Sequence, residues 1–320
     1  MKYKSIAFSL LGLGLLAAPA FSAEPARPGT VNYVEGAAYI DGQQIDSKQI
    51  GNIDLNPGQE LTTAKGKAEV LLTPGVFLRV DDNSAVKMIS PDLTLTQVQI
   101  DKGRAGVEVD EIHDQNNLQI IDAGVTTRLQ KNGYYEFDAG KPEVMVFKGK
   151  ADVEVASNKG KEVKGNHELA LDAENGTALA KEKPAGFDAN ASNDDLANWS
   201  RLRSQYLSEA NNELAPEYAA DGYYPGWYWD PYGFGYTFIG AGPLYSPWGW
   251  GFYPFGWYGG WGGGWYGRPI YGHGYYGHGH VYGGHERFAV QHEGFAHSGG
   301  MGFHGGTGGG GFHGGGGHGR

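Results

Sequence analysis

The chain has 320 residues, no cysteine and a formal net charge of −11 at pH 7. Without cysteine it can form no disulfide, no thiolate metal site and no lipid anchor through a lipoprotein cysteine. The acidic balance, with no basic stripe to offset it, argues against nucleic acid as a partner.

Residues 1–23 have the features of a secretory signal peptide. Lys2 and Lys4 precede the apolar run "IAFSLLGLGLLAA", and small residues follow in "APAFSA". Cleavage after Ser22 places small residues at the favoured positions, and cleavage after Ala20 is the alternative. The apolar run is shorter than the roughly 20 residues of a membrane-spanning helix. We therefore expect a periplasmic or secreted protein.

Residues 24–182 predict an all-β domain. The stretch "AEVLLTPGVFLRV" at 68–80 alternates around a Thr-Pro-Gly turn, and "LTLTQVQI" at 93–100 alternates apolar with polar residues. Turn-forming stretches such as "DNS" at 82–84 and "DKG" at 101–103 recur every 8 to 12 residues or so, as all-β domains require. We expect the carboxylates beside these turns to be solvated surface groups, namely Asp81, Asp82, Asp110 and Glu111.

Two stretches of this domain repeat one another. "VQIDKGRAGVEV" at 98–109 and "VMVFKGKADVEV" at 144–155 agree, or differ conservatively, at nine of twelve positions, and "VNYVEGAAYI" at 31–40 fits more loosely. We interpret each copy as a β-hairpin in which Gly103 or Gly149 supplies the turn. Repeated hairpins that share their valines predict a β-sandwich or a short β-solenoid. Convergence of two unrelated hairpins on the same pattern is the alternative.

The stretch "NPGQELTTAKGKAEVLLTPGVFLRVDDNSAVKM" at 56–88 resembles the FecR domain. The matching positions are Gly58, Leu61, Thr62 or Thr63, Ala68, Val70, Leu71, Leu72, Gly75, Leu78, Val80 and Ser84. The resemblance extends over about residues 30–170, because the two repeats fit the later strands of the family. It implies a periplasmic, mainly β domain, which in iron-uptake regulators passes a signal from an outer-membrane receptor to a sigma factor. Since we recognise no anti-sigma segment or spanning helix, we expect binding in the envelope rather than transmembrane signalling.

After a linker at 183–191, residues 192–213 predict an amphipathic helix. Ser192 and Asp195 have the spacing of a capping box. Several large or apolar residues follow at helical spacing on one face: Leu196, Trp199, Leu202, Tyr206 and Ala210. We expect this face to pack on the β domain. The alternative is a partner-binding helix anchored by Trp199 and Tyr206, with Arg203 either stacked on Trp199 or solvated.

Residues 214–320 form a low-complexity tail. Of the 55 glycines, 36 follow residue 220, and seven of the eight tryptophans lie within 223–267. We expect a disordered tail, with an ordered aromatic flap against the β domain as the alternative. Frequent glycine and proline argue against a membrane-spanning helix.

Nine of the eleven histidines lie in the last fifty residues. Spacings such as His278-Gly-His280 are compatible with weak binding of nickel, copper or zinc, and with charging as the pH falls through about 6.5. A glycine-rich chain loses much conformational entropy on chelation, so we assign no metal site.

Catalytic motifs are not found. "HEGFAH" at 292–297 is one residue too long for a helical zincin motif, and only His113 and His167 fall in the β domain. We therefore expect no enzyme, no catalytic residue and no cofactor. The leading hypothesis is a non-enzymatic FecR-domain binding or adaptor module in the periplasm or cell envelope, contacting a protein or glycan surface. The alternative is a metal-binding or metal-responsive protein that acts through its tail.

Overall fold

The computed structural model describes residues 26–254, except 114, 155–159, 173–176, 179–182, 190–193, 222–223, 232 and 234. The predicted signal peptide, the end of the tail and its nine histidines lie outside the described residues. One short 3-10 helix, η1, spans Ser47–Gln49, and one α-helix, α1, spans Asp195–Asp221.

The strands before α1 belong to one sheet: β1 (Val31–Ile40), β2 (Gln43–Gln44), β3 (Glu60–Leu71), β4 (Val76–Val80), β5 (Ala85–Asp92), β6 (Leu95–Lys102), β7 (Arg104–Val109), β8 (Leu118–Asp122), β9 (Val125–Leu129), β10 (Gly133–Asp138), β11 (Glu143–Lys148), β12 (Lys150–Val153), β13 (Lys161–Lys164), β14 (His167–Asp172), β15 (Thr177–Ala178) and β16 (Ala185–Gly186). Two short hairpins follow α1, made of β17 (Gly226–Asp230) with β18 (Gly235–Ile239) and β19 (Leu244–Tyr245) with β20 (Gly251–Phe252).

The prediction of an all-β domain is confirmed. The strand order is β13-β12-β9-β8-β6-β5-β3-β4-β7-β10-β11-β14-β15, and β1 pairs with β3 beside this path. The long strand β3 joins two parts, because its first residues pair with β5 and its last residues pair with β4. We call β13-β12-β9-β8-β6-β5 the first layer and β4-β7-β10-β11-β14 the second layer. The Thr-Pro-Gly turn joins β3 to β4 as predicted.

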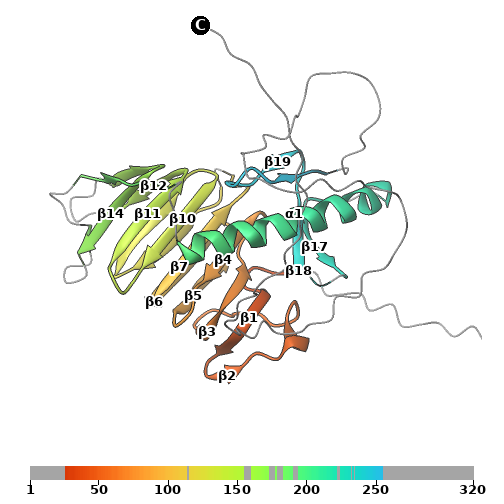
Figure 1. Cartoon of the computed structure of the whole chain (residues 1–320), viewed down its shortest axis with the longest axis horizontal. Coiled ribbons are helices and arrows are strands. Elements are labelled where there is room, and N and C mark those ends of the chain that lie inside the picture. Colours follow the sequence, from red (N-terminus) through yellow and green to blue (C-terminus); the bar gives the residue numbers. More distant parts are fainter. Residues whose placement is uncertain are drawn as a thin grey trace, which may run out of the picture. The chain divides into compact units, whose positions relative to one another are not determined.

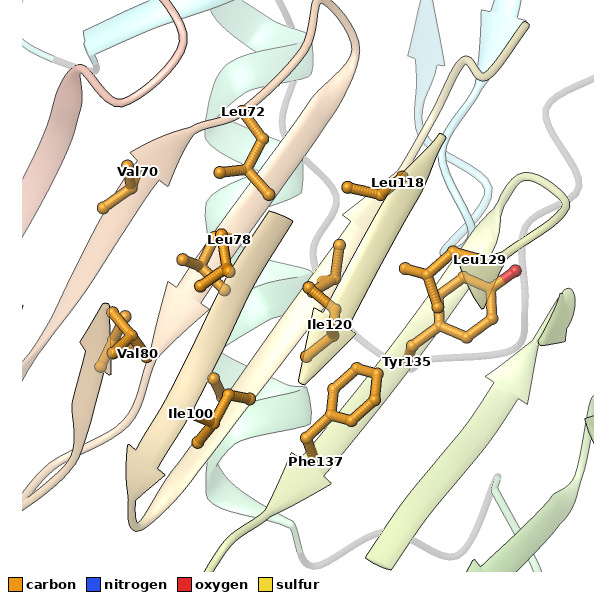
Figure 2. Packing of buried hydrophobic residues seen from close by; sticks show 14 of the residues in the cluster. Val70, Leu72, Leu78, Val80, Ile100, Leu118, Ile120, Leu129, Tyr135 and Phe137 are labelled. Carbon is orange, nitrogen blue, oxygen red and sulfur yellow. The ribbon is translucent and has the colours of Figure 1, made fainter. Parts of the chain in front are cut away.

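The hydrophobic core lies between the two layers. Alternate side chains of both layers point toward one another (Figure 2), as for Leu78 of β4 and Ile120 of β8. The repeat valines at 98, 107, 144 and 153 are all fully buried in this one cluster. Because successive side chains of a strand point to opposite faces, the other half of the second layer's residues must lie on its outer face.

The repeated stretches do not form hairpins, contrary to the prediction. β6 pairs with β5 and β8 whereas β7 pairs with β4 and β10, so the two halves of the first copy lie in different layers. β11 and β12 are separated in the same way. Gly103 and Gly149, with φ of 67° and 109°, lie at the corners where the chain crosses between layers. In the looser copy, Gly36 lies at an irregularity within the single strand β1.

Helix α1 covers the outer face of the second layer, lying across β4 and β7 (Figure 1). It begins at Asp195 rather than at residue 192 and continues through Pro216 to Asp221, beyond the predicted end at 213. Leu214 and Ala215 pack with Ile239 of β18, and this packing compensates for a proline in the helix. The expected linker also contributes β16, which pairs with β14.

Part of the expected tail is ordered against the domain, as the flap alternative proposed. Phe238 of β18 and Phe252 of β20 are buried in a cluster with Phe77 of the second layer and Leu207 of α1. Trp227 packs edge-on against Phe77, with ring centroids 5.0 Å apart. The aromatic residues of 226–252 therefore form a second, smaller core on the outer face.

The corner at Gly149 predicts a specific sensitivity. A Cβ there would collide with the Tyr135 hydroxyl, which donates a hydrogen bond to the Lys131 carbonyl oxygen at 2.5 Å. We expect Gly149→Ala to lower the free energy of unfolding by about 3 kcal/mol in urea titrations. Gly42→Ala is the matched control, because Gly42 also has a positive φ (80°) but has no neighbour within 4 Å of the added Cβ. It should cost about 1 kcal/mol, and equal losses for the two variants would contradict this assignment.

Candidate functional site: a buried charge layer beneath the helix

Charged residues occupy the outer face of β3, β4 and β7. Glu69, Arg79 and Glu108 alternate with core residues of the same strands, so they point away from the core and toward α1. All three are fully buried, and Arg203 of α1 is 3% exposed. We call these four residues the buried charge layer.

Glu69 lies between two guanidinium groups. Its Oε2 accepts a hydrogen bond from Arg79 Nε at 3.0 Å, and its Oε1 accepts one from Arg203 Nη2 at 2.9 Å. Asn32 of β1 also donates to Oε1, at 2.8 Å. Arg203 in turn lies over the ring of Tyr33, 4.0 Å from its centroid. The carboxylate thereby joins β1, β3, β4 and α1.

Glu108 is the second carboxylate of the layer. It pairs with Arg79 Nη1 and accepts a hydrogen bond from Ser204 of α1 at 2.6 Å. Trp248, between β19 and β20, donates its indole N–H to Glu108 Oε2 at 2.9 Å. Glu108 therefore connects the sheet to the helix and to the aromatic hairpins.

The pKa directions follow from burial opposed by pairing. Burial alone would raise the pKa of Glu69, but Arg203 and Arg79 overcome it and hold this pKa below its ordinary value. Burial also opposes the charge on Arg79, yet Glu108 and Glu69 raise its pKa above the ordinary value. Pairing therefore favours the charged forms of Glu69 and Arg79 despite their burial.

The predicted docking face of the helix is only partly correct. Leu196 and Trp199 are buried as predicted, but Leu202 is 45% exposed and Tyr206 is half-buried. The buried face also carries Ser200, Arg203, Ser204, Ser208 and Asn211. The spacing of apolar residues predicted the wrong buried face because the sheet beneath the helix is itself polar. Polar side chains of the helix therefore face the sheet and pair with its polar groups. Trp199, the expected anchor for a partner, instead donates its indole N–H to Glu35 Oε2 within the same chain, at 2.8 Å.

A second ionic cluster holds the start of α1. Arg104 of β7 pairs with Asp194 and donates a hydrogen bond to Glu136 of β10 at 2.5 Å. Asp194 caps the helix by accepting a hydrogen bond from the Ala197 N–H at 2.9 Å. The predicted cap, Ser192, lies outside the described residues. Burial and the nearby Asp194 raise the pKa of Glu136 to about 7 against the opposing effect of Arg104.

A hollow of about 490 Å³ lies beside this cluster. It is lined by five carboxylates, one guanidinium group and two small or polar residues: Asp81, Asp82, Asn83, Gly103, Arg104, Asp138, Asp194 and Asp195. Its chemistry suits a basic group rather than an anion. No group of acidic or histidine side chains among the described residues has the arrangement of a metal site.

The carboxylates expected at the surface divide into two groups. Asp82 is exposed and Glu111 is half-buried, but Asp81 is buried in a pair with Lys67, and Asp110 is fully buried. Burial, with the neighbouring Glu108, raises the pKa of Asp110 well above its ordinary value. The prediction for Asp81 and Asp110 was wrong because neighbouring side chains can cover a residue next to a turn: Lys67 pairs with Asp81, and Glu108 lies beside Asp110.

The two histidines of the domain lie apart from one another. His113 is exposed beside Glu111, and His167 Nδ1 lies 2.9 Å from the carbonyl oxygen of Gly165.

Among the described residues, no helix has both the length and the apolar character that crossing a bilayer requires.

The chain matches no protein-family profile and no curated protein. Among solved structures, it is similar to a protein of Parabacteroides distasonis described as a candidate anti-sigma factor. The likeness covers 48% of this chain and 73% of that protein, with 14% identity and a TM-score of 0.36. A likeness of this strength carries no argument about function.

Asp122, at the end of β8, gives a prediction for pH dependence. Burial and the nearby Asp138 raise its pKa to about 7, above the value of about 4 in an unfolded chain. The folded state therefore holds this proton more tightly, and the resulting stabilisation is complete below pH 4 and lost as the pH rises through 7. Asn cannot titrate, so Asp122→Asn does not lose this stabilisation. The free energy of unfolding of the variant, measured by urea titration, should therefore rise by about 2 kcal/mol relative to that of the native chain as the pH increases from 4 to 8.

Asp41→Asn is the matched control with the opposite sign. Hydrogen bonds from the Glu60 N–H and the Gln59 side chain lower the pKa of Asp41. Its contribution is present at neutral pH and is lost on acidification, so this variant should lose stability relative to the native chain as the pH rises. A gap between Asp122→Asn and the native chain that does not change with pH would contradict the assignment.

Proposed function

We propose that this chain is a non-enzymatic binding or adaptor module of the periplasm or cell envelope. In this proposal the signal peptide at 1–23 directs export, and the β domain acts as a FecR-like scaffold. The partner is a protein or glycan surface of the envelope. The titratable groups of the buried charge layer serve the scaffold, because each is held by neighbouring residues of the fold rather than aimed into a pocket.

The observation that carries the proposal is the division of the aromatic residues from the end of α1 onward into buried and exposed rings. Inner rings such as Tyr236 and Phe238 are buried against the domain. Outer tyrosines remain in solvent: Tyr224 is 85% exposed, Tyr245 is 55% exposed and Tyr218, on α1, is 37% exposed. Inner rings fix the hairpins. The ring of Tyr218 packs against Tyr228 and that of Tyr245 against Tyr253, with centroids 4.4 Å and 6.2 Å apart, so these two outer rings are held in place for contacts with a partner. Tyrosine is enriched in binding surfaces because it offers a large rigid ring and a polar hydroxyl.

The FecR part of the proposal is supported by the order of the matched segments. Residues 56–88 contain the β3–β4 hairpin and the first half of β5, and the two later repeats cross between layers in the same manner. A regulatory or signalling role is an extension of this resemblance. It requires a receptor or sigma-factor partner, which co-purification from the native envelope would reveal.

The test replaces the outer tyrosines. The variant Tyr218→Ser/Tyr224→Ser/Tyr245→Ser should bind isolated envelope material about tenfold more weakly than the native chain, because side chains central to an interface each contribute 1 kcal/mol or more. Binding is measured by co-sedimentation with membrane vesicles and, separately, with purified cell-wall glycan. The two fractions distinguish a protein or lipid partner from a glycan.

The matched control is Leu93→Ser/Leu95→Ser, which removes exposed apolar side chains, 51% and 38% exposed, from the β5–β6 turn. It should bind as the native chain does. Equal binding by the tyrosine variant and the native chain would contradict the role of the tyrosines. Failure of the native chain to bind any envelope fraction would contradict the adaptor function itself.

The alternative, metal binding, rests on histidines outside the described residues. The tail is best removed by ending the chain at Pro254, because this truncation keeps every described element. A truncation near the expected start of the tail, at Pro216, would cut α1 and remove both aromatic hairpins. Calorimetric titration of nickel, copper and zinc into the full chain and the chain ending at Pro254 therefore isolates the tail. Tight binding that is lost with the tail would favour the alternative.

A further inference from the structure

We propose that the outer face of β3, β4 and β7 is a binding slot for an arginine-bearing helix. In this structure α1 occupies the slot, and we propose that it can dissociate from the slot while the sheet remains folded. The proposal concerns recognition between the sheet and a helix. It does not depend on the exposed tyrosines or on the envelope partner.

Charge balance is the first argument. Without α1, the slot contains the carboxylates of Glu69 and Glu108 and the guanidinium group of Arg79, which leaves one negative charge uncompensated. Arg203 supplies the missing positive charge from the helix, through its hydrogen bond to Glu69 at 2.9 Å. A buried carboxylate without a partner is strongly destabilising, so the slot selects a helix with a cation at this position.

Hydrogen bonding is the second argument. Ser204, next to Arg203, donates to Glu108 Oε1 at 2.6 Å, and the Ser200 hydroxyl lies 2.9 Å from the Tyr134 hydroxyl. Ser200, Arg203, Ser204 and Leu207 fall at three- and four-residue spacing, so they share one helix face. The slot is therefore complementary to a helix face that carries two hydroxyl groups and one arginine, and Leu207 supplies the apolar contact.

The polarity of the contact indicates that it serves recognition. A permanent helix–sheet contact is commonly apolar, and replacing buried ion pairs by well-packed apolar groups is often neutral or stabilising. Here the contact keeps four charges, and the helix leaves Leu202 45% exposed. Buried charges make the contact depend on one register of one helix. Although Phe77 and Leu207 pack together beside the charges, hydration of Glu69 and Glu108 would offset part of the loss when the helix leaves.

The first experiment is hydrogen exchange of the full chain carrying Arg203→Glu. Repulsion from Glu69 and Glu108 should release α1, and its amides should exchange roughly 100-fold faster, while β3, β4 and β7 keep their protection. Arg201→Glu is the matched control, because it makes the same charge change on the exposed face two residues away. It should leave α1 protected.

The second experiment adds a fluorescent peptide with the α1 sequence, residues 194–221, to the full-length variant chain. The native peptide should bind the Arg203→Glu chain, whose slot is vacated, at least about tenfold more tightly than it binds the native chain, whose slot is filled. A peptide carrying Arg203→Glu should bind neither chain. Fluorescence anisotropy measures both.

Three results would overturn the proposal. Unchanged protection of α1 in Arg203→Glu would show that the arginine does not hold the helix. Loss of protection in β4 and β7 together with α1 would show that the helix is an inseparable part of the fold. Absence of peptide binding to a variant chain with released α1 would show that the face is not a slot.

Discussion

The outer half of the structure depends on one carboxylate, Glu69, held between the guanidinium groups of Arg79 and Arg203. A charge in a buried site costs several kcal/mol unless a partner of opposite sign compensates for it. Arg79 comes from the neighbouring strand, but its other bond goes to Glu108, so the sheet cannot balance its own charges. The helix completes the balance, and the strands β3, β4 and β7 thereby specify where α1 must lie.

The position of α1 in turn places the aromatic segment that follows it. Asn211 donates to the carbonyl oxygen of Phe238 at 2.9 Å and accepts from the Tyr253 N–H at 2.7 Å, so one side chain joins both hairpins to the helix. Ser208 donates to the carbonyl oxygen of Gly251 at 2.6 Å. These bonds satisfy the backbone of two short hairpins that are too small to be stable by themselves. The helix therefore positions the two aromatic hairpins, and Tyr245 of β19 with them.

Sequence reasoning found the elements better than it found their partners. Alternation in 68–80 and the Thr-Pro-Gly turn were sufficient for β3 and β4, and the shared valines of the repeats marked the core. The crossing of the repeats between layers could not be seen, because Val98 and Val107 alternate identically in a hairpin and in two layers. The charge layer was missed because a Glu or Arg in the polar phase of a strand ordinarily faces water. The sequence offered one indication of this layer: Arg203 lies on the same helical face as Trp199 and three residues after Ser200, so a charged residue falls on the face that was expected to be buried.

A double-mutant cycle between Glu69→Gln and Arg203→Met, followed by urea unfolding, tests the central claim most directly. If the carboxylate and the guanidinium group hold the helix on the sheet, the two losses of unfolding free energy should be non-additive, with a coupling of about 1 to 3 kcal/mol. Losses that add to within about 0.5 kcal/mol would contradict it, since the two residues would then act independently.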